Sequence, residues 1–337
     1  MNAAYRQHSG RVVERDARFS HVMAIALNPR TDYTEGVIRC ITSREGDVVV
    51  KGFTDRSVLC TVRGNLEQYK IGEPLTIHNQ EQIVKTLQTE GLDFLGLEDP
   101  DIWIDEGAQS LHLYFTMPFI SKDKNRWPTL IHLGHACGKN LNSLTMTGPT
   151  LQADSHGKNS AKECSIAPLN SRGSRYNLFE SSANEDGEWY STVRVAVAQD
   201  MGKPWQFSET LFHPKEHGIP WIGGHASPGP LLPRSFIDIG EGKLVGIMNG
   251  REANTKMGDK TIYGVFSVGL FVYDYEHGKI DWVSPEPLTR DSEARTITFA
   301  SQFVETKPGE GILYAHVDDS FVRAYTLYAQ GIAELLP

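Results

Sequence analysis

Three acidic residues surround one proline in the segment LGLEDPDIWID, residues 95–105, just before an alternating apolar run. They are Glu98, Asp99 and Asp101, and a solvated turn does not require so many acids. The acidic residues at comparable positions elsewhere are Glu163, Glu180, Asp318 and Asp319. Carboxyl groups held together away from water raise one another's pKa, so that one stays protonated while another is ionised. Hydrolysis of a glycosidic bond needs such a pair, and the residues therefore point to acid–base chemistry on a neutral sugar.

Structural interpretations compete with this chemical one. The turn around Pro100 can simply be solvated, and Asp318 with Asp319 can form a hairpin turn. Glu163 and Glu180 can instead form salt bridges with the nearby basic residues Lys162, Arg172 and Arg175. No HExxH, CxxC, GxGxxG or P-loop pattern occurs in the sequence, so neither a metal site nor a cofactor is predicted.

The composition narrows the class of protein. The 337 residues carry a formal net charge of −9, which disfavours binding to a nucleic-acid backbone. No apolar run approaches the ~18 residues of a transmembrane helix, and the polar N-terminal stretch lacks the apolar core of a secretory signal. The four cysteines, which stand apart from one another, are Cys40, Cys60, Cys137 and Cys164. We expect free thiols, a cytoplasmic location and no membrane partner, while a homo-oligomer is compatible with the sequence.

Short strand-like runs separated by Gly, Asn, Asp and Pro fill most of the chain, such as DVVVKGF, LHLYFTM and VRVAVAQD. Residues 79–91 have the best helical pattern. The runs predict an all-β protein, either a pair of sandwiches or a propeller. A weak repeat of roughly 50–65 residues, counted about five times from Arg39, favours a five-bladed β-propeller. We predict an N-terminal tail over residues 1–20 and one propeller domain over residues 21–337, in which the strand HVMAIAL helps to close the ring.

A propeller would bring the polar residues of distant segments together. The innermost strand of each blade lines a central funnel, so residues at the starts of successive blades converge there. The candidate residues at or near these starts are Asn28, Arg39, Glu98, Asp99, Asp101, Lys162, Glu163, Glu180, His225, Asn249, Asp318 and Asp319. The rings available for stacking on a sugar are those of Trp103, Tyr114, Trp221 and Tyr263.

The order of these motifs resembles glycoside hydrolase family 130, the β-mannoside phosphorylases and β-1,2-mannosidases, which are five-bladed propellers. The segment LEDPDIW is similar to the family's Glu-Asp-Pro-Arg motif, whose Asp is the proton donor, and this role carries over to Asp99. LNP followed by VIRC resembles a motif that places Arg39 near the sugar. LYAHVDDSFV is similar to a Gly-Ala-Ala-Asp-Thr motif and places Asp318 or Asp319 on sugar hydroxyls. AKECSIAPLN and HASPGPLL resemble the family's Lys-Asp and proline-rich segments.

Departures from the family pattern bear on which molecule accepts the sugar. Asp101 and Glu180 stand where the resemblance leads us to expect arginines. The expected lysine falls near Gly223, and the expected histidine falls at Asn249. In the phosphorylases these basic positions hold phosphate, and only Lys162 of the set remains. A site that has lost bases and gained acids repels a phosphate dianion, so the resemblance implies that water is the acceptor.

Our first hypothesis is an inverting, exo-acting glycoside hydrolase that acts on a β-mannoside or related oligosaccharide. Asp99 is its general acid and Glu180, or else Glu163, its base, whereas a mapping onto the related propeller families 43, 32 and 117 exchanges the roles of Asp99 and Glu163. The residues expected to hold the sugar are Asn28, Arg39, Glu98, Asp101, Lys162, His225, Asn249, Asp318 and Asp319. The alternatives are a phosphorylase releasing mannose 1-phosphate, with Arg251 or Arg323 adding to the anion site, and a non-catalytic carbohydrate-binding propeller.

Overall fold

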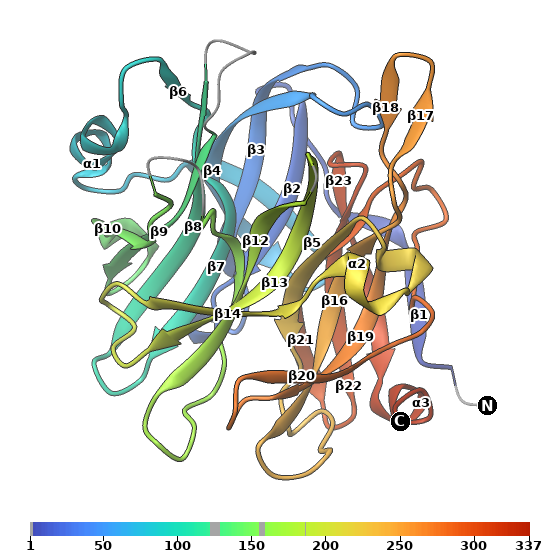
Figure 1. Cartoon of the computed structure of the whole chain (residues 1–337). Helices are drawn as coiled ribbons and strands as arrows, with labels where there is room; N and C mark the ends of the chain where they lie inside the picture. Colours follow the sequence, from blue (N-terminus) through green and yellow to red (C-terminus); the bar gives the residue numbers. More distant parts are fainter. Residues whose placement is uncertain (1–2, 122–128, 155–158, 186) are drawn as a thin grey trace.

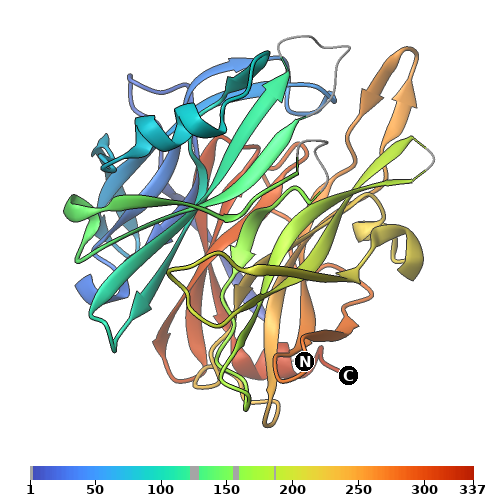
Figure 2. The ribbon, with the colours of Figure 1, turned by 60° about the vertical axis from the view of Figure 1, so that its left-hand side comes forward.

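Antiparallel strands make up most of the computed structural model, which describes residues 3–121, 129–154, 159–185 and 187–337. Figures 1 and 2 show several sheets arranged around a common centre, in a propeller-like way. The all-β prediction is therefore confirmed. The helices of the described ranges are short: α1 (Gln80–Leu87), α2 (Pro214–His217), α3 (Ala329–Ala333) and the 3-10 helices η1 (Pro29–Thr31), η2 (Leu141–Ser143) and η3 (Pro220–Ile222). The helix predicted within residues 79–91 is α1.

The strands fall into antiparallel groups that follow one another along the chain. The first group contains β2 (His21–Leu27), β3 (Glu35–Glu45), β4 (Thr54–Asn65) and β5 (Gln68–Pro74). The second contains β7 (Glu98–Asp105), β8 (Ser110–Ser121), β9 (Leu130–Gly138) and β10 (Thr145–Leu151), with β6 (Leu92–Phe94) added along β8. The third contains β11 (Lys162–Ser165), β12 (Arg175–Glu185), β13 (Glu188–Ala198) and β14 (Gln206–Phe212).

The remaining groups complete the chain. The fourth contains β15 (His225–Leu231), β16 (Lys243–Arg251), β19 (Phe266–Asp274) and β20 (Lys279–Val283), and a single parallel bridge between Ser191 and His225 joins it to the third. A hairpin of β17 (Thr255–Met257) and β18 (Lys260–Ile262) projects from it. The last group contains β21 (Thr298–Lys307), β22 (Glu310–Val317), β23 (Phe321–Tyr328) and, from the start of the chain, β1 (Tyr5–Val13).

The first strands of neighbouring groups contact one another in a closed ring. β2 contacts β7, β7 contacts β11, β11 contacts β15, β15 contacts β21, and β21 contacts β2. The ring brings the starts of the groups together, as the propeller hypothesis requires.

The pairing of β1 with β23 joins the two ends of the chain, with Tyr5 opposite Leu327. The prediction of a tail is therefore wrong for residues 5–13. The strand HVMAIAL is β2, the first strand of its own group, and its contacts with β21 of the last group complete the ring of first strands, whereas β1 joins the two ends of the chain. The polar character of β1 misled the sequence interpretation, since an outermost strand needs little apolar surface.

Arg323 on β23 fixes the position of β1. Its Nη1 donates to the carbonyl oxygens of His8 at 2.9 Å and Ser9 at 3.1 Å, and its Nε lies 2.7 Å from the carboxylate of Asp291. The side chain of Arg323 is 1% exposed. It therefore serves the closure between β1 and β23 and does not contribute to an anion site at the centre.

Apolar clusters fill the spaces between neighbouring groups. One, which includes Val12, Ile25, Cys60 and Tyr314, packs the first group against the last. Middle strands such as β8 and β22 are buried at almost every residue because sheets cover both of their faces.

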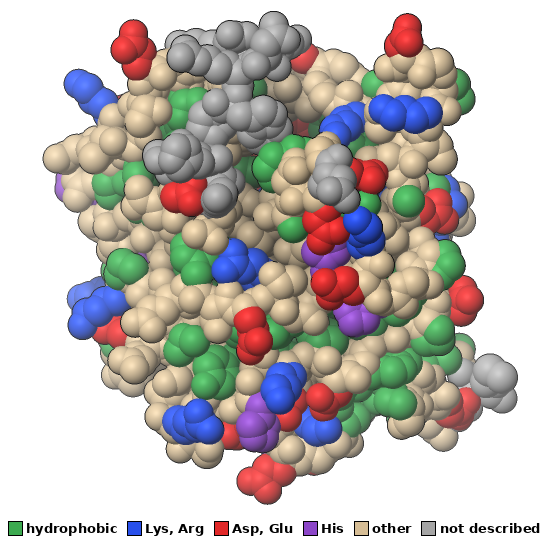
Figure 3. All heavy atoms as spheres, in the orientation of Figure 1, with side chains coloured by type: hydrophobic (Ala, Val, Ile, Leu, Met, Phe, Trp, Pro, Cys, Tyr) green, Lys and Arg blue, Asp and Glu red, His purple; other side chains and the backbone are tan. Residues whose placement is uncertain are grey.

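All four cysteines are free thiols, as predicted. None of the helices in the described ranges has the length and apolar character to cross a membrane. On the face shown in Figure 3, acidic and basic side chains are interspersed.

A shared irregularity marks the first strands of the first three groups. The register of strand pairing shifts around Ala24, Asp99 and Glu163, and these residues have φ angles of 46°, 47° and 49°. A left-handed conformation is costly for a residue with a side chain, and such strain tends to gather at functional sites. The bulges place a carboxyl group at the centre in the second and third groups, whereas the first group places only the methyl group of Ala24 there.

Candidate active site

A cavity of about 440 Å³ opens at the centre of the ring. Most of its polar wall comes from the starts of the first strands and from loops between groups. Its charged and histidine side chains include Asp55, Glu98, Asp99, Glu163, Asp319, Arg39, Lys162, Arg251, His225 and His316. Its aromatic rings are those of Phe53, Trp189, Tyr190, Tyr263, Phe266 and Phe299. The mixture of acids and rings suits a polar ligand with apolar faces, such as a sugar.

The guanidinium of Arg39 holds two carboxyl groups of the cavity at once. Its Nη2 lies 2.7 Å from Glu98 Oε1, its Nη1 donates to Asp99 Oδ1 at 2.8 Å, and its Nε donates to the Ser57 hydroxyl at 3.1 Å. Burial raises the pKa of Glu98 to about 7 although Arg39 opposes this, and the charge of Asp99 raises it further. Arg39 is thus fully occupied within the protein and fixes the orientation of both acids.

Glu180 lies behind the cavity wall between two basic side chains. It is 0% exposed, its Oε1 lies 3.1 Å from Lys162 Nζ, and its Oε2 lies 3.1 Å from His225 Nε2. Burial alone would raise its pKa, but His225 and Lys162 outweigh that effect and hold the pKa of Glu180 well below its ordinary value. Glu180 therefore acts as the counterion that orients Lys162 and His225, which themselves line the cavity.

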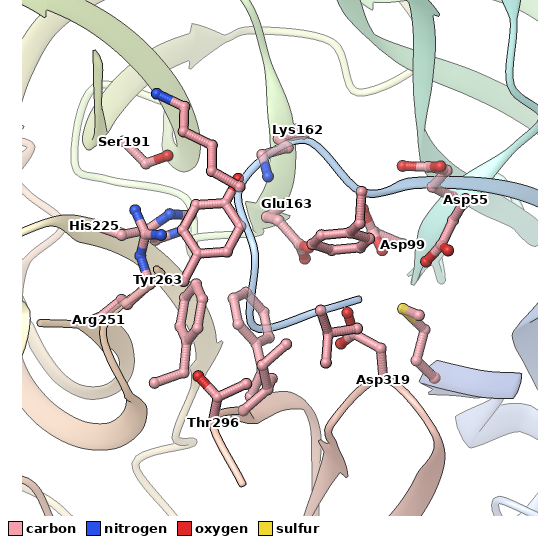
Figure 4. A pocket seen from close by; sticks show the side chains of 18 of the residues that line it. Asp55, Asp99, Lys162, Glu163, Ser191, His225, Arg251, Tyr263, Thr296 and Asp319 are labelled. Atoms are coloured by element: carbon pink, nitrogen blue, oxygen red, sulfur yellow. The ribbon is translucent and has the colours of Figure 1, made fainter. Parts of the chain in front are cut away.

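Glu163 follows Lys162 on β11 and points into the cavity beside Asp99 (Figure 4). Burial raises the pKa of Glu163 well above its ordinary value, and the negative charge of Asp99 raises it further. Asp99, in contrast, is an ion-pair partner of Arg39. The cavity thus holds a carboxyl group of raised pKa beside one that is paired with an arginine.

A third carboxyl cluster lies on the opposite side of Asp99 from Glu163 (Figure 4). Arg44 pairs with Asp55 through two contacts of 2.7 Å and reaches Asp319 at 3.9 Å. His316 Nδ1 accepts the backbone N–H of Ala24 at 3.3 Å, so its Nε2 carries the proton that faces Asp319 Oδ1 at 3.2 Å. Burial would raise the pKa of Asp319, but His316 and Arg44 bring it below its ordinary value.

The structure places several candidates of the sequence analysis away from this cavity. Asn28 caps η1 by accepting the backbone N–H of Arg30, and Asn249 exchanges two hydrogen bonds with the backbone of Ala300. Asp318 accepts the backbone N–H groups of residues 295, 296 and 297 at 2.8 to 2.9 Å. All three side chains are satisfied within the protein, and none lines the cavity.

Asp101 also lies elsewhere, in a second cavity of about 220 Å³ on the other side of the strained bulges. The Cys164 thiol donates to Asp101 Oδ2 at 3.7 Å, and burial raises the pKa of Asp101 to about 7. The candidates that the structure does bring together at the main cavity are Arg39, Glu98, Asp99, Lys162, Glu163, His225 and Asp319.

Several residues of the cavity did not stand out in the sequence. Asp55 and the Arg44 that pairs with it lie on neighbouring strands of the first group, and no motif flagged them. Of the four rings singled out for stacking, Tyr263 lines the main cavity and Trp103 lines the second one. Tyr114 and Trp221 are buried in the cores of the sheets. The ring residues Phe53 and Trp189 could have been found only from their places at strand ends beside the acidic segments.

Several solved structures of carbohydrate-active proteins superpose on this chain. A glycosyl hydrolase from Bacteroides ovatus superposes with a TM-score of 0.67 at 16% identity, covering 97% of this chain and 94% of its own. A β-1,2-mannobiose phosphorylase from Listeria innocua superposes with a TM-score of 0.59 at 14% identity, covering 99% and 90%. A mannose phosphorylase from Leishmania mexicana, bound to phosphate, gives 0.57 at 13% identity, covering 98% and 91%.

The chain shares their fold. The resemblance to glycoside hydrolase family 130 seen in the sequence motifs is thereby confirmed for the fold, with the divergence that the motifs indicated. No protein-family model and no curated protein sequence matches the chain. At such low identity the likeness carries over the arrangement of strands, and the chemistry has to be argued from the side chains of the cavity. Among the side chains that the structure describes, no group of three or more His, Cys, Asp or Glu residues is arranged to hold a metal ion.

Proposed function

We propose that the protein is a glycoside hydrolase with a five-bladed β-propeller fold. The observation that carries the proposal is the pair of Asp99 and Glu163, which occupy strained bulges on adjacent first strands and point into one cavity. The surroundings of the two carboxyl groups differ, since burial raises the pKa of Glu163 while Asp99 pairs with Arg39, and such a difference suits the acid and the base of glycosidic-bond hydrolysis.

The different surroundings of the two carboxyl groups suggest their roles. Glu163 gives its proton to the glycosidic oxygen as the bond from that oxygen to the anomeric carbon breaks. Asp99 takes a proton from water as the water oxygen bonds to the anomeric carbon. This assigns the acid to Glu163 and the base to Asp99, which exchanges the roles in our first hypothesis and agrees with the mapping onto the related propeller families. Glu180 is a poor base because it is 0% exposed and already paired twice.

Water is a better acceptor than phosphate in this cavity. Arg39 contacts the carboxyl groups of both Glu98 and Asp99. Lys162 contacts Glu180 and lies close enough to Glu163 to interact with its charge. The positive charge of each base is therefore already balanced within the protein. A phosphate dianion that attacks the anomeric carbon would have to approach the carboxylate of Asp99, the proposed base, whose arginine partner Arg39 already holds two carboxyl groups, and like charges at short range repel.

The shape of the cavity favours attack at a chain end. Asn254 and Tyr263, which flank the β17–β18 hairpin, line the cavity together with Val48 and Lys51. The two segments are joined by hydrogen bonds from the backbone N–H of Lys51 to the carbonyl of Thr261 and from that of Tyr263 to the carbonyl of Val49. Segments joined in this way would close one side of the cavity to a long polysaccharide, and we therefore favour an exo-acting enzyme. The fold shared with the mannobiose and mannose phosphorylases supports a β-mannoside or a related oligosaccharide as substrate.

Paired substitutions test the roles of the two carboxyl groups. We expect Asp99→Asn and Glu163→Gln each to lower the rate of hydrolysis by about 100-fold or more while the protein stays folded. The Glu163→Gln variant should recover activity on aryl glycosides, whose leaving groups need no proton, and the Asp99→Asn variant should recover activity with added azide, which replaces the activated water. Product analysis should show inversion at the anomeric carbon. Full activity of either variant on natural-type oligosaccharides would refute the assignment.

Product analysis in phosphate buffer and binding measurements distinguish the hydrolase from the two alternative functions. If mannose 1-phosphate forms when the reaction is run in phosphate buffer, the protein is a phosphorylase. If oligosaccharides bind in calorimetry without any turnover, and Asp99→Asn changes nothing, the protein is a carbohydrate-binding propeller.

A further inference from the structure

Arg251 differs from the other basic side chains at the centre of the ring that are shielded from water; Lys51, which also lines the cavity, is exposed. Arg39 contacts Glu98 and Asp99, Lys162 contacts Glu180, and Arg44 contacts Asp55. Arg251, the last residue of β16, lines the cavity beside His225, its partner in the strand register. Within the described part of the chain, its guanidinium has no carboxylate partner, and its Nε has no hydrogen-bond acceptor.

The place of Arg251 makes this lack of a counterion costly. The residue is 6% exposed, and its Cζ lies 4.4 Å from the centre of the Tyr263 ring and 5.4 Å from that of Phe266. Burial lowers the pKa of Arg251, which is the effect of removing a charge from water without a matching anion. A buried charge is retained only where something compensates it, and a ligand can do so when the protein does not.

We propose that Arg251 binds the carboxylate of an acidic sugar, so that the substrate of this cavity contains a uronic acid residue. This inference rests on the proposed function and narrows its substrate class. Stacking against Tyr263 holds the guanidinium at the cavity wall, where its N–H groups can meet a carboxylate in the bidentate way that suits arginine.

The distribution of charge across the cavity favours a carboxylate on the sugar over phosphate. Arg251, His225 and Tyr263 lie on one side of the cavity, and Asp55, Asp99 and Asp319 lie on the other (Figure 4). A sugar with one carboxylate can turn that group toward Arg251 while its neutral hydroxyls face the acids. A phosphate dianion that attacks the anomeric carbon would instead have to lie near Asp99 and Glu163.

Binding measurements test the proposal without depending on catalysis. We would titrate the Glu163→Gln protein by calorimetry with D-glucuronate, D-mannuronate, the neutral sugars D-glucose and D-mannose, and inorganic phosphate. A charged hydrogen-bonded pair in a buried site corresponds to about 2 kcal/mol, so we expect at least one uronate to bind about 30-fold more tightly than its neutral counterpart. Adding Arg251→Met should remove this preference. The matched control is Arg234→Met, because Arg234 is an exposed arginine paired with Asp238 at 2.9 Å, and it should leave the preference unchanged.

Three results would overturn the inference: equal binding of uronates and neutral sugars, a uronate preference that survives Arg251→Met, or tighter binding of phosphate than of either uronate through Arg251. Loss of folding does not confuse the test, since Arg251→Met removes an uncompensated buried charge and should be at least as resistant to urea as the parent protein. A uronate preference with no hydrolysis by the unsubstituted enzyme would refute the proposed function and leave the subsite standing. Hydrolysis of neutral oligosaccharides without any uronate preference would support the proposed function and refute the uronate subsite.

Discussion

Replacing Asp101 with asparagine should stabilise the protein at neutral and alkaline pH. Asparagine keeps the shape of the side chain and removes the carboxyl, whose pKa burial raises from 3.8 to about 7. A rise of about three units at about 1.4 kcal/mol per unit corresponds to about 4 kcal/mol. The side chain keeps partial exposure to water, so we expect about half of this, roughly 2 kcal/mol in the free energy of unfolding.

The pH dependence of this effect has a definite sign. Because the pKa of Asp101 is higher in the folded protein than in the unfolded chain, the folded state binds more protons between about pH 4 and pH 7. Stability therefore falls as the pH rises through this window, and the penalty is complete above about pH 7. Below about pH 4 the carboxyl is neutral in both states, so the advantage of asparagine should disappear there.

Urea unfolding at pH values from 4 to 8.5, followed by tryptophan fluorescence, measures this difference through the midpoint at constant slope. The matched control is Asp259→Asn in the exposed turn between β17 and β18, which should change stability by less than about 0.5 kcal/mol at every pH. A destabilised Asp101→Asn protein, or a difference that does not vary with pH, would show that Asp101 is ionised and compensated. Near-normal turnover by Asp101→Asn is expected too, since its carboxyl lies outside the main cavity.

Two further substitutions at buried charged residues should lower the stability of the protein, in contrast to Asp101→Asn. Glu180→Gln should destabilise the protein by about 3 kcal/mol at pH 7, because it leaves the ammonium of Lys162 without its counterion. Since the pKa of Glu180 is lowered by folding, this loss should shrink as the pH falls below its ordinary value of 4.5, and a loss that is constant in urea unfolding down to pH 3 would contradict the charge assignment. Arg323→Met should cost about 3–5 kcal/mol and make residues 5–13 sensitive to proteases, whereas Arg11→Met, an exposed arginine on the same strand pair, should change protection little.

Much of the fold could be predicted because the middle strands are covered on both faces. Runs such as LHLYFTM and YGVFSVGLFVYDY are almost continuously apolar for that reason, and glycine, asparagine and proline mark the turns between them. β1 was missed because an outermost strand can be polar, and its partner β23 is more than 300 residues away in the sequence. Pairing over such a distance leaves no local pattern.

The sequence predicted the two central carboxyl groups of the candidate site, Asp99 and Glu163, but not residues farther along the cavity wall such as Asp55. Asp99 and Glu163 stand in short motifs, but their conformation, with positive φ, depends on register shifts that the sequence does not reveal. Asp101 was placed with Asp99 because it is two residues away, yet the bulge between Glu98 and Asp101 sends it to the other cavity. A residue count alone cannot anticipate this, since one extra residue in a strand changes the face to which the following side chains point.

The ratio of acids to bases explains why protons remain at the centre of the ring near neutral pH. Arg39 serves Glu98 and Asp99, and Lys162 serves Glu180 and lies beside Glu163, so each base is shared by two acids and one acid of each pair has a raised pKa. In the third cluster, Arg44 is shared by Asp55 and Asp319, but His316 donates to Asp319 as well, and the pKa of Asp319 is lowered. Glu180 is likewise contacted by a histidine, His225, and its pKa is lowered too, whereas the raised pKa in that cluster falls on its neighbour Glu163. A proton is therefore retained where the protein supplies one donor too few, and Glu163 is the place where that shortage coincides with a strained bulge facing the cavity.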